Sequence, residues 1–125
     1  MSPDTVLLRQ IHPSFVQDGR VTSQAFRPMP KDELHLSVDN GDRVSAEQAW
    51  RRFIANPACT SVGVQALAHS DCTAHELTVI EDGQPYPEHC TIDFSAFDKK
   101  TVEKKAKLLR AAAEARGWLY KVAAA

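Results

Sequence analysis

An alanine-rich amphipathic segment near the C-terminal end narrows the possible folds more than any other part of this chain. Apolar side chains recur there at intervals of three or four residues, at Val102, Ala106, Leu109 and Ala113. This spacing is typical of a helix that buries one face. Ser95 or Asp98 can cap the first turn, and Gly117 can adopt the left-handed conformation that closes the last. We therefore predict a helix over about 97–117 that covers a hydrophobic core.

A second helix is indicated by the run Ser45-Ala46-Glu47-Gln48. Ser45 and Gln48 fit a capping box, in which each side chain accepts a hydrogen bond from the other residue's backbone amide. Apolar residues then fall on one face, and Pro57 disfavours helical geometry in the residue before it. These signals predict a helix over about 45–55.

Strand signals are shorter and lie on both sides of the predicted helix at 45–55. Segments rich in β-branched or alternating apolar residues, bounded by turn-forming residues, occur at 6–11, 21–26, 34–38, 60–67, 77–80 and 90–94. Strands and helices do not alternate regularly, which favours an antiparallel or mixed sheet over a parallel one. With 125 residues the chain has room for one core. We expect one α+β domain over 1–125, with a mixed or antiparallel sheet packed against the two helices.

Composition places the chain among ordinary globular proteins. It is 43% hydrophobic and 25% charged, with a net charge of −1. The N-terminal residues contain neither a basic leader nor a long apolar run, so we expect a soluble, cytoplasmic protein. Its three cysteines, Cys59, Cys72 and Cys90, match no disulfide framework, and we expect free thiols.

A cluster of possible metal ligands lies in the stretch AHSDCTAHE. His69, Cys72 and His75 are spaced by three residues, and imidazole and thiolate groups are the ligands that zinc prefers. No pair of cysteines two residues apart accompanies them. The alternative interpretation is a polar turn or short surface helix whose histidines face solvent.

A second candidate site lies in the stretch PYPEHCTIDFS. Its prolines stiffen a loop that delivers His89 to the start of a predicted strand. Paired with Glu88 or Asp93, His89 could act as a general acid or base. Folding could bring Arg9 or His12 of the first strand to the same place. The alternative is an ordinary junction between a loop and a strand.

Positive charge is concentrated near the C-terminal end. Residues 98–121 carry eight lysines and arginines but three acidic residues. Lys100, Lys104 and Lys107 could bind an acidic protein partner, or they could form a solvated helix face. The slightly acidic chain as a whole does not favour nucleic acid, and the alanine-rich face does not favour a membrane surface.

No complete catalytic motif is present. The scattered glycines form no phosphate-binding loop, no serine lies in a nucleophile elbow, and no cofactor is expected. We therefore expect a non-enzymatic accessory or neutralising module that binds another protein, and a core that leaves no cavity for chemistry. The main alternative is a small enzyme or toxin with its site around His89. Zinc binding and nucleic-acid binding are lesser alternatives.

Overall fold

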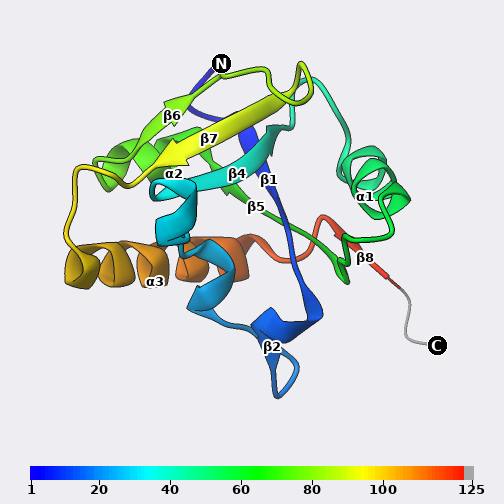
Figure 1. Ribbon diagram of the computed structural model, residues 1–125, viewed down its shortest axis with the longest axis horizontal. Helices are drawn as coiled ribbons and strands as arrows, with labels where there is room; N and C mark the ends of the chain where they lie inside the picture. The colour runs from blue at the N-terminus through cyan, green and yellow to red at the C-terminus, as the bar shows by residue number, and fades with distance from the viewer. Residues whose placement is uncertain (123–125) are drawn as a thin grey trace.

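The structure is a computed structural model that describes residues 1–122. Its main sheet is antiparallel throughout and has the strand order β6-β7-β4-β1-β5-β8 (Figure 1). The strands are β1 (Val6–Gln10), β4 (His35–Asn40), β5 (Gly63–Ala68), β6 (Thr78–Ile80), β7 (His89–Asp93) and β8 (Tyr120–Lys121). This arrangement confirms the α+β fold and selects the antiparallel form of the predicted sheet.

Helix α3 (Lys99–Arg116) is the long helix predicted from the apolar stripe. Asp98 caps it by accepting a hydrogen bond from the amide of Thr101 at 2.8 Å. Gly117 follows the last turn with a φ of 84°, a conformation that glycine adopts without steric cost. The four apolar residues of its stripe are buried against one face of the sheet.

Helix α1 (Ala46–Ala55) covers part of the opposite face. The capping box forms as predicted, with the Ser45 hydroxyl and the Gln48 carboxamide accepting from each other's backbone amides. Adjacent strand residues point to opposite faces of a sheet, so Leu7 packs in the α3 cluster while Leu8 packs against Ala49 of α1. Because α1 lies over β1, β5 and β8, it leaves the outer face of β4, β7 and β6 uncovered.

The sheet divides between its two central strands. β1 pairs with β5 along five residues, but it pairs with β4 at only two positions, Leu7 with Asn40 and Leu8 with Asp39. Beyond Leu8 the strands separate, and the side chain of Arg9 reaches across the gap to donate a hydrogen bond from Nη1 to the carbonyl oxygen of Ser37 at 3.1 Å. The gap between β1 and β4 is therefore open on both faces of the sheet beside Arg9.

The segment predicted as a strand over 21–26 is mostly helical, and that prediction was wrong. A two-residue strand, β3 (Arg20–Val21), pairs with β2 (Val16–Gln17) and is followed by the 3-10 helix η2 (Ser23–Phe26). Thr22 ends the strand because both its amide and its hydroxyl donate to the carbonyl oxygen of Phe15. Two further short 3-10 helices, η1 (Pro13–Phe15) and η3 (Pro30–Asp32), flank this region.

Two elements are present that the sequence did not indicate clearly. Helix α2 (His69–Ala74) follows β5 directly, and its first turn is held by the Asp71 carboxylate, which accepts from the amide of Ala68. β8 forms where the chain turns back after α3 and adds an edge strand to β5. Among residues 1–122, no helix has both the length and the apolar composition needed to cross a membrane.

Candidate functional site

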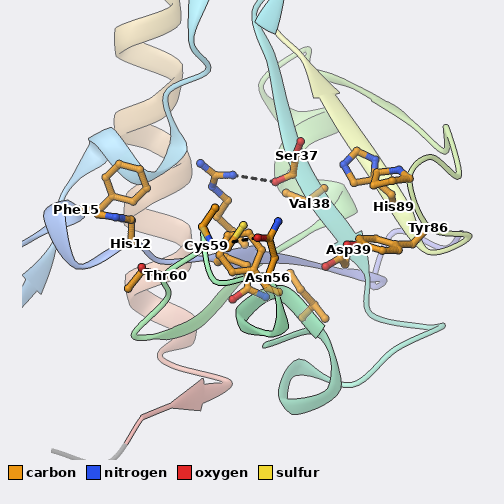
Figure 2. A pocket seen from close by; sticks show the side chains of 16 residues that line it. His12, Phe15, Ser37, Val38, Asp39, Asn56, Cys59, Thr60, Tyr86 and His89 are labelled. Carbon is orange, nitrogen blue, oxygen red and sulfur yellow. Dashed lines mark hydrogen bonds between the residues drawn. The ribbon is translucent and has the colours of Figure 1, made fainter. Parts of the chain in front are cut away.

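A cavity of about 480 Å³ opens on the α1 side of the divided sheet (Figure 2). Its walls come from β1, β4, the end of α1 with the loop that follows, and the loop between β6 and β7. The residues that line it are Leu8, Arg9, Gln10, His12, Phe15, Ser37, Val38, Asp39, Phe53, Asn56, Ala58, Cys59, Thr60, Pro85, Tyr86 and His89. A volume of this size is typical of small-molecule sites. The cavity contradicts the expectation that the core leaves no such space.

His89 lines this cavity, and the carboxylate of Asp82 contacts one of its ring nitrogens. Its Nδ1 lies 2.6 Å from Oδ1 of Asp82, and the other carboxylate oxygen accepts from the hydroxyl of Thr91 at 2.7 Å. Burial acts to raise the pKa of Asp82, but the hydrogen bonds from His89 and Thr91 lower it below its usual value. An ionised carboxylate can only accept, so Nδ1 carries the proton and Nε2 is left to exchange a proton with a ligand.

Asp39 lies directly opposite His89 in the register of β4 and β7. Directly opposed residues point to the same face of a sheet, with Cβ atoms about 4.5–5.5 Å apart. Burial raises the pKa of the Asp39 carboxyl, and the charges of Arg52 and His89 offset this only in part. The cavity wall therefore presents an imidazole and a carboxyl group whose protonation is shifted toward the acid form.

The rim beside these groups is fixed by Arg52 of α1. Its guanidinium forms an ion pair with Glu88 and lies over the ring of Tyr86, 4.0 Å from the ring centre. The loop that carries Tyr86 and Glu88 is thereby fastened to α1. An aromatic ring held in this way can pack against the face of a bound ligand.

A polar group without a partner lies in the wall on β1. The carboxamide nitrogen and oxygen of Gln10 are both buried, and neither has a hydrogen-bond partner within residues 1–122. Buried polar groups are nearly always satisfied, so a water molecule or a ligand is needed here. Gln10 thus adds a donor and an acceptor to the cavity.

Three of the residues predicted for a catalytic site line the same cavity, with His12 and His89 on opposite sides of it (Figure 2). His89, Arg9 and His12 all line the cavity, although they lie far apart along the chain. The carboxylates predicted to accompany His89 do not face it in this way. Glu88 pairs with Arg52, and Asp93 pairs with His35 at 3.5 Å and accepts from the amide of Ser95.

The sequence reasoning missed both carboxylates that do accompany His89. Asp82 sits seven residues before His89 and is returned to it by the loop between β6 and β7. Asp39 is brought opposite His89 by the pairing of β4 with β7. A signal for Asp39 was present, because polar residues alternate along His35–Asn40, but nothing in the sequence identifies the strand with which it pairs.

The predicted metal ligands His69, Cys72 and His75 are not gathered into a metal site. His69 begins α2, Cys72 is buried in the core, and His75 ends the helix. Burial, together with the smaller effect of the charge of Asp71, raises the pKa of the Cys72 thiol to about 12. Within residues 1–122, no three histidine, cysteine or acidic side chains are placed so that they could hold a metal ion.

Lys100, Lys104 and Lys107 are exposed on the outer face of α3, away from the cavity. In the part of the chain that the structure describes, none of them lies within 4.0 Å of a carboxylate oxygen. Their ammonium groups are therefore available to solvent or to a partner. This exposure fits both a partner-binding surface and a solvated helix face.

The three cysteines are free and differ in accessibility, which allows a simple test of the cavity geometry. Cys59 lines the cavity and is partly exposed, whereas Cys72 and Cys90 are buried, and burial raises their thiol pKa values to about 12 and about 11. Only thiolates react rapidly with disulfide reagents. We expect one fast-reacting thiol in the folded protein and three after denaturation. In Cys59→Ser no fast thiol should remain, and two fast thiols in the native protein would contradict this packing.

Comparisons with models of protein families, with curated proteins and with solved structures find no match for this chain. Its function must therefore be argued from the site alone.

Proposed function

We propose that this protein is a small enzyme that uses His89 for general acid–base catalysis on a polar small molecule. The observation that carries the proposal is the arrangement of His89 between two carboxylates at the wall of a cavity. Asp82 holds one ring nitrogen, and Asp39 lies opposite on the next strand. A carboxylate that orients an imidazole is a recurring device of proton-transfer sites.

The proposed roles follow from the protonation of each group. Nε2 of His89 accepts a proton from a nucleophile, either water or a substrate hydroxyl, while the Asp82 carboxylate stabilises the resulting imidazolium. Asp39 has a raised pKa and is suited to donate a proton to a leaving group. Hydrolysis and transfer of an acyl, phosphoryl or glycosyl group both need these two proton transfers.

Blocking the cavity tests the proposal before the natural substrate is known. Chromogenic carboxylic esters, phosphate monoesters and glycosides are assayed with the wild-type protein and with protein labelled by a bulky maleimide. Because Cys59 is the accessible thiol in the cavity wall, the label should abolish turnover. The Cys59→Ser variant should retain turnover after the same treatment. Absence of turnover in all three substrate classes, or full turnover after labelling, would argue against an enzyme.

The raised pKa of Asp39 predicts a conflict between stability and function. Because the folded-state pKa lies above the unfolded-state value, the folded protein loses stability as pH rises between the two. Asn mimics the protonated acid, so Asp39→Asn should raise the free energy of unfolding at pH 7. The gain should vanish below about pH 3, where both states are protonated.

Asp93→Asn is the matched control for this effect. The hydrogen bonds from Ser95 lower the pKa of Asp93, so its ionised form contributes stability above the unfolded-state pKa and loses it as pH falls. This variant should be less stable than the wild-type protein at pH 7. Urea denaturation at pH 3 and pH 7 measures both changes, and a loss of stability in Asp39→Asn at pH 7 would contradict the shift.

A second candidate function is the binding of an acidic protein through the outer face of α3. It is supported by three exposed lysines that have no carboxylate partner within residues 1–122, two of which lie in the first two turns of the helix. Positive charge near a helix N-terminus opposes the helix dipole and costs stability, so a binding role would explain its presence. Titration with polyglutamate should show salt-dependent binding that Lys100→Glu/Lys104→Glu/Lys107→Glu abolishes. If Lys121→Glu weakens binding as much as that variant does, the face has no special role.

A further inference from the structure

A second cavity lies on the α3 side of the divided sheet, behind the one already described. It has a volume of about 1120 Å³, is open to solvent on one side, and is lined by η1, the segment from η2 to Leu34, and the first turns of α3. Arg9, His12 and Phe15 line both cavities, so the two spaces adjoin at these residues, where β1 and β4 part.

The walls of the second cavity are mainly apolar. Phe15, Met29, Leu34 and Val102 contribute side chains, and prolines on either side of Met29 stiffen the segment. Met29 is 53% exposed and adds a flexible apolar side chain to the edge of the hollow. Such a surface favours an apolar ligand body.

Positive charge exceeds negative charge around this cavity. Four basic residues line it, Arg9, Arg27, Lys31 and Lys99, against two acidic ones, Asp32 and Glu103. The first turn of α3 contributes Lys99 and Val102 to this wall, while its N-terminal amides are already capped by Asp98. An anion would be stabilised here by the surplus of basic side chains.

Within the described residues, one guanidinium donor at this cavity is unsatisfied, and another guanidinium group has no ion pair. Nε of Arg27 is buried and has no hydrogen-bond partner within residues 1–122, and its nearest carboxylate oxygen, on Glu103, lies 3.9 Å from Nη1. Arg9 donates only to backbone carbonyl oxygens, of Ala25 and Ser37, and forms no ion pair in the described chain. Arg27 thus keeps one unsatisfied donor beside a weak ion pair, and its side chain is 40% exposed, within reach of a dissolved anion.

We propose that this second cavity binds a small organic anion, a carboxylate or sulfonate attached to an aromatic or aliphatic body. The anionic head meets Arg27, Lys31 and Lys99, and the body packs against Phe15, Met29 and Val102. This site shares Arg9, His12 and Phe15 with the first cavity, but His89 and Asp39, the groups of the proposed acid–base chemistry, do not line it.

The probe that tests the site is 8-anilinonaphthalene-1-sulfonate, an aromatic anion whose fluorescence rises in apolar surroundings. It should bind saturably to one site on the folded protein. N-phenyl-1-naphthylamine, the same ring system without the sulfonate, should bind about tenfold more weakly because it lacks the charge-assisted contacts. Near-UV circular dichroism confirms that each protein remains folded.

Matched charge reversals locate the probe. Lys31→Glu/Lys99→Glu should weaken binding of the sulfonate about tenfold. Lys100→Glu/Lys107→Glu changes the net charge equally on the outer face of α3 and should alter binding by less than about twofold. Equal weakening by both variants, equal binding of the neutral probe, or the absence of saturable binding would overturn the proposal.

The maleimide label on Cys59 separates this site from the proposed catalytic one. Cys59 lines only the first of the two cavities, so labelled protein should lose turnover and still bind the sulfonate. Loss of sulfonate binding after labelling would place the probe in the first cavity and refute the second site. A protein that binds the sulfonate as predicted but turns over no substrate would refute only the enzyme.

Discussion

Replacing His89 with glutamine is expected to lower kcat/KM by about 100- to 10,000-fold, the usual contribution of a general acid or base. Glutamine is similar in size and can keep a hydrogen bond to Asp82, so the wall of the cavity should survive. What it cannot do is accept a proton at the position of Nε2. The substrate is whichever chromogenic compound the wild-type protein turns over best, and initial rates are measured over a range of pH.

The effect of substituting Asp82 on the rate of the enzyme should depend on whether His89 is present. Asp82→Asn is expected to slow the wild-type enzyme, because the carboxylate orients the imidazole and stabilises its charged form. In the His89→Gln background the same change should have little further effect, since the group that it supports is gone. Independent, multiplicative losses from the two substitutions would mean that Asp82 does not act through His89.

Leu109→Ala is expected to lower the free energy of unfolding by about 2–5 kcal/mol. Leu109 is 0% exposed and lies at the centre of the stripe with which α3 covers the sheet. Truncation would leave a cavity that the close-packed neighbours can fill only in part. Urea denaturation with an unchanged m value would show the loss as a shift of the midpoint.

The residue before it on α3 provides the control. Leu108 is 40% exposed, so Leu108→Ala removes the same atoms and should change stability by no more than about 0.5 kcal/mol. Similar losses from the two substitutions would show that α3 does not pack with the face described above. Because the core beneath α3 supports β4 and β7, Leu109→Ala should also lower kcat/KM at the site that these strands carry.

The two main helices were predictable because their signals are local. Ser45 and Gln48 act within one turn of α1, and Asp98 and Gly117 act at the two ends of α3. The side chains of Ser45, Gln48 and Asp98 accept from backbone amides close to them in sequence. Gly117 acts through its own backbone amide, which donates to the carbonyl oxygen of Ala113. The apolar stripe of α3 then specified the face that the helix buries.

The residues at 21–26 show where local pattern fails. The sequence pattern of Val21 to Phe26 indicates a short strand. Thr22, however, donates hydrogen bonds to the carbonyl oxygen of Phe15, and the chain then forms η2. Arg9 donates a hydrogen bond to the carbonyl oxygen of Ala25, and this contact holds η2 against the divided sheet. These partners lie 7 and 16 residues away, beyond the reach of periodicity.

The candidate site was predictable only in part for the same reason. His89, with its stiff loop, and Arg9, charged on a strand, were conspicuous as residue types. The partners of His89 depend on how the chain returns to it. Asp82 arrives through the loop between β6 and β7, and Asp39 through pairing of β4 with β7, a register that sequence pattern does not specify.

His35 provides the decisive comparison for the acid–base site. It lies on the same face of the sheet as Asp39 and also pairs with a carboxylate, Asp93, but it lies outside the cavity. Turnover by His35→Gln and His89→Gln, measured side by side at equal protein stability, tests whether the cavity histidine performs the chemistry. We expect His35→Gln to retain wild-type kcat/KM and His89→Gln to lose nearly all of it; equal rates in the two variants would contradict the assignment.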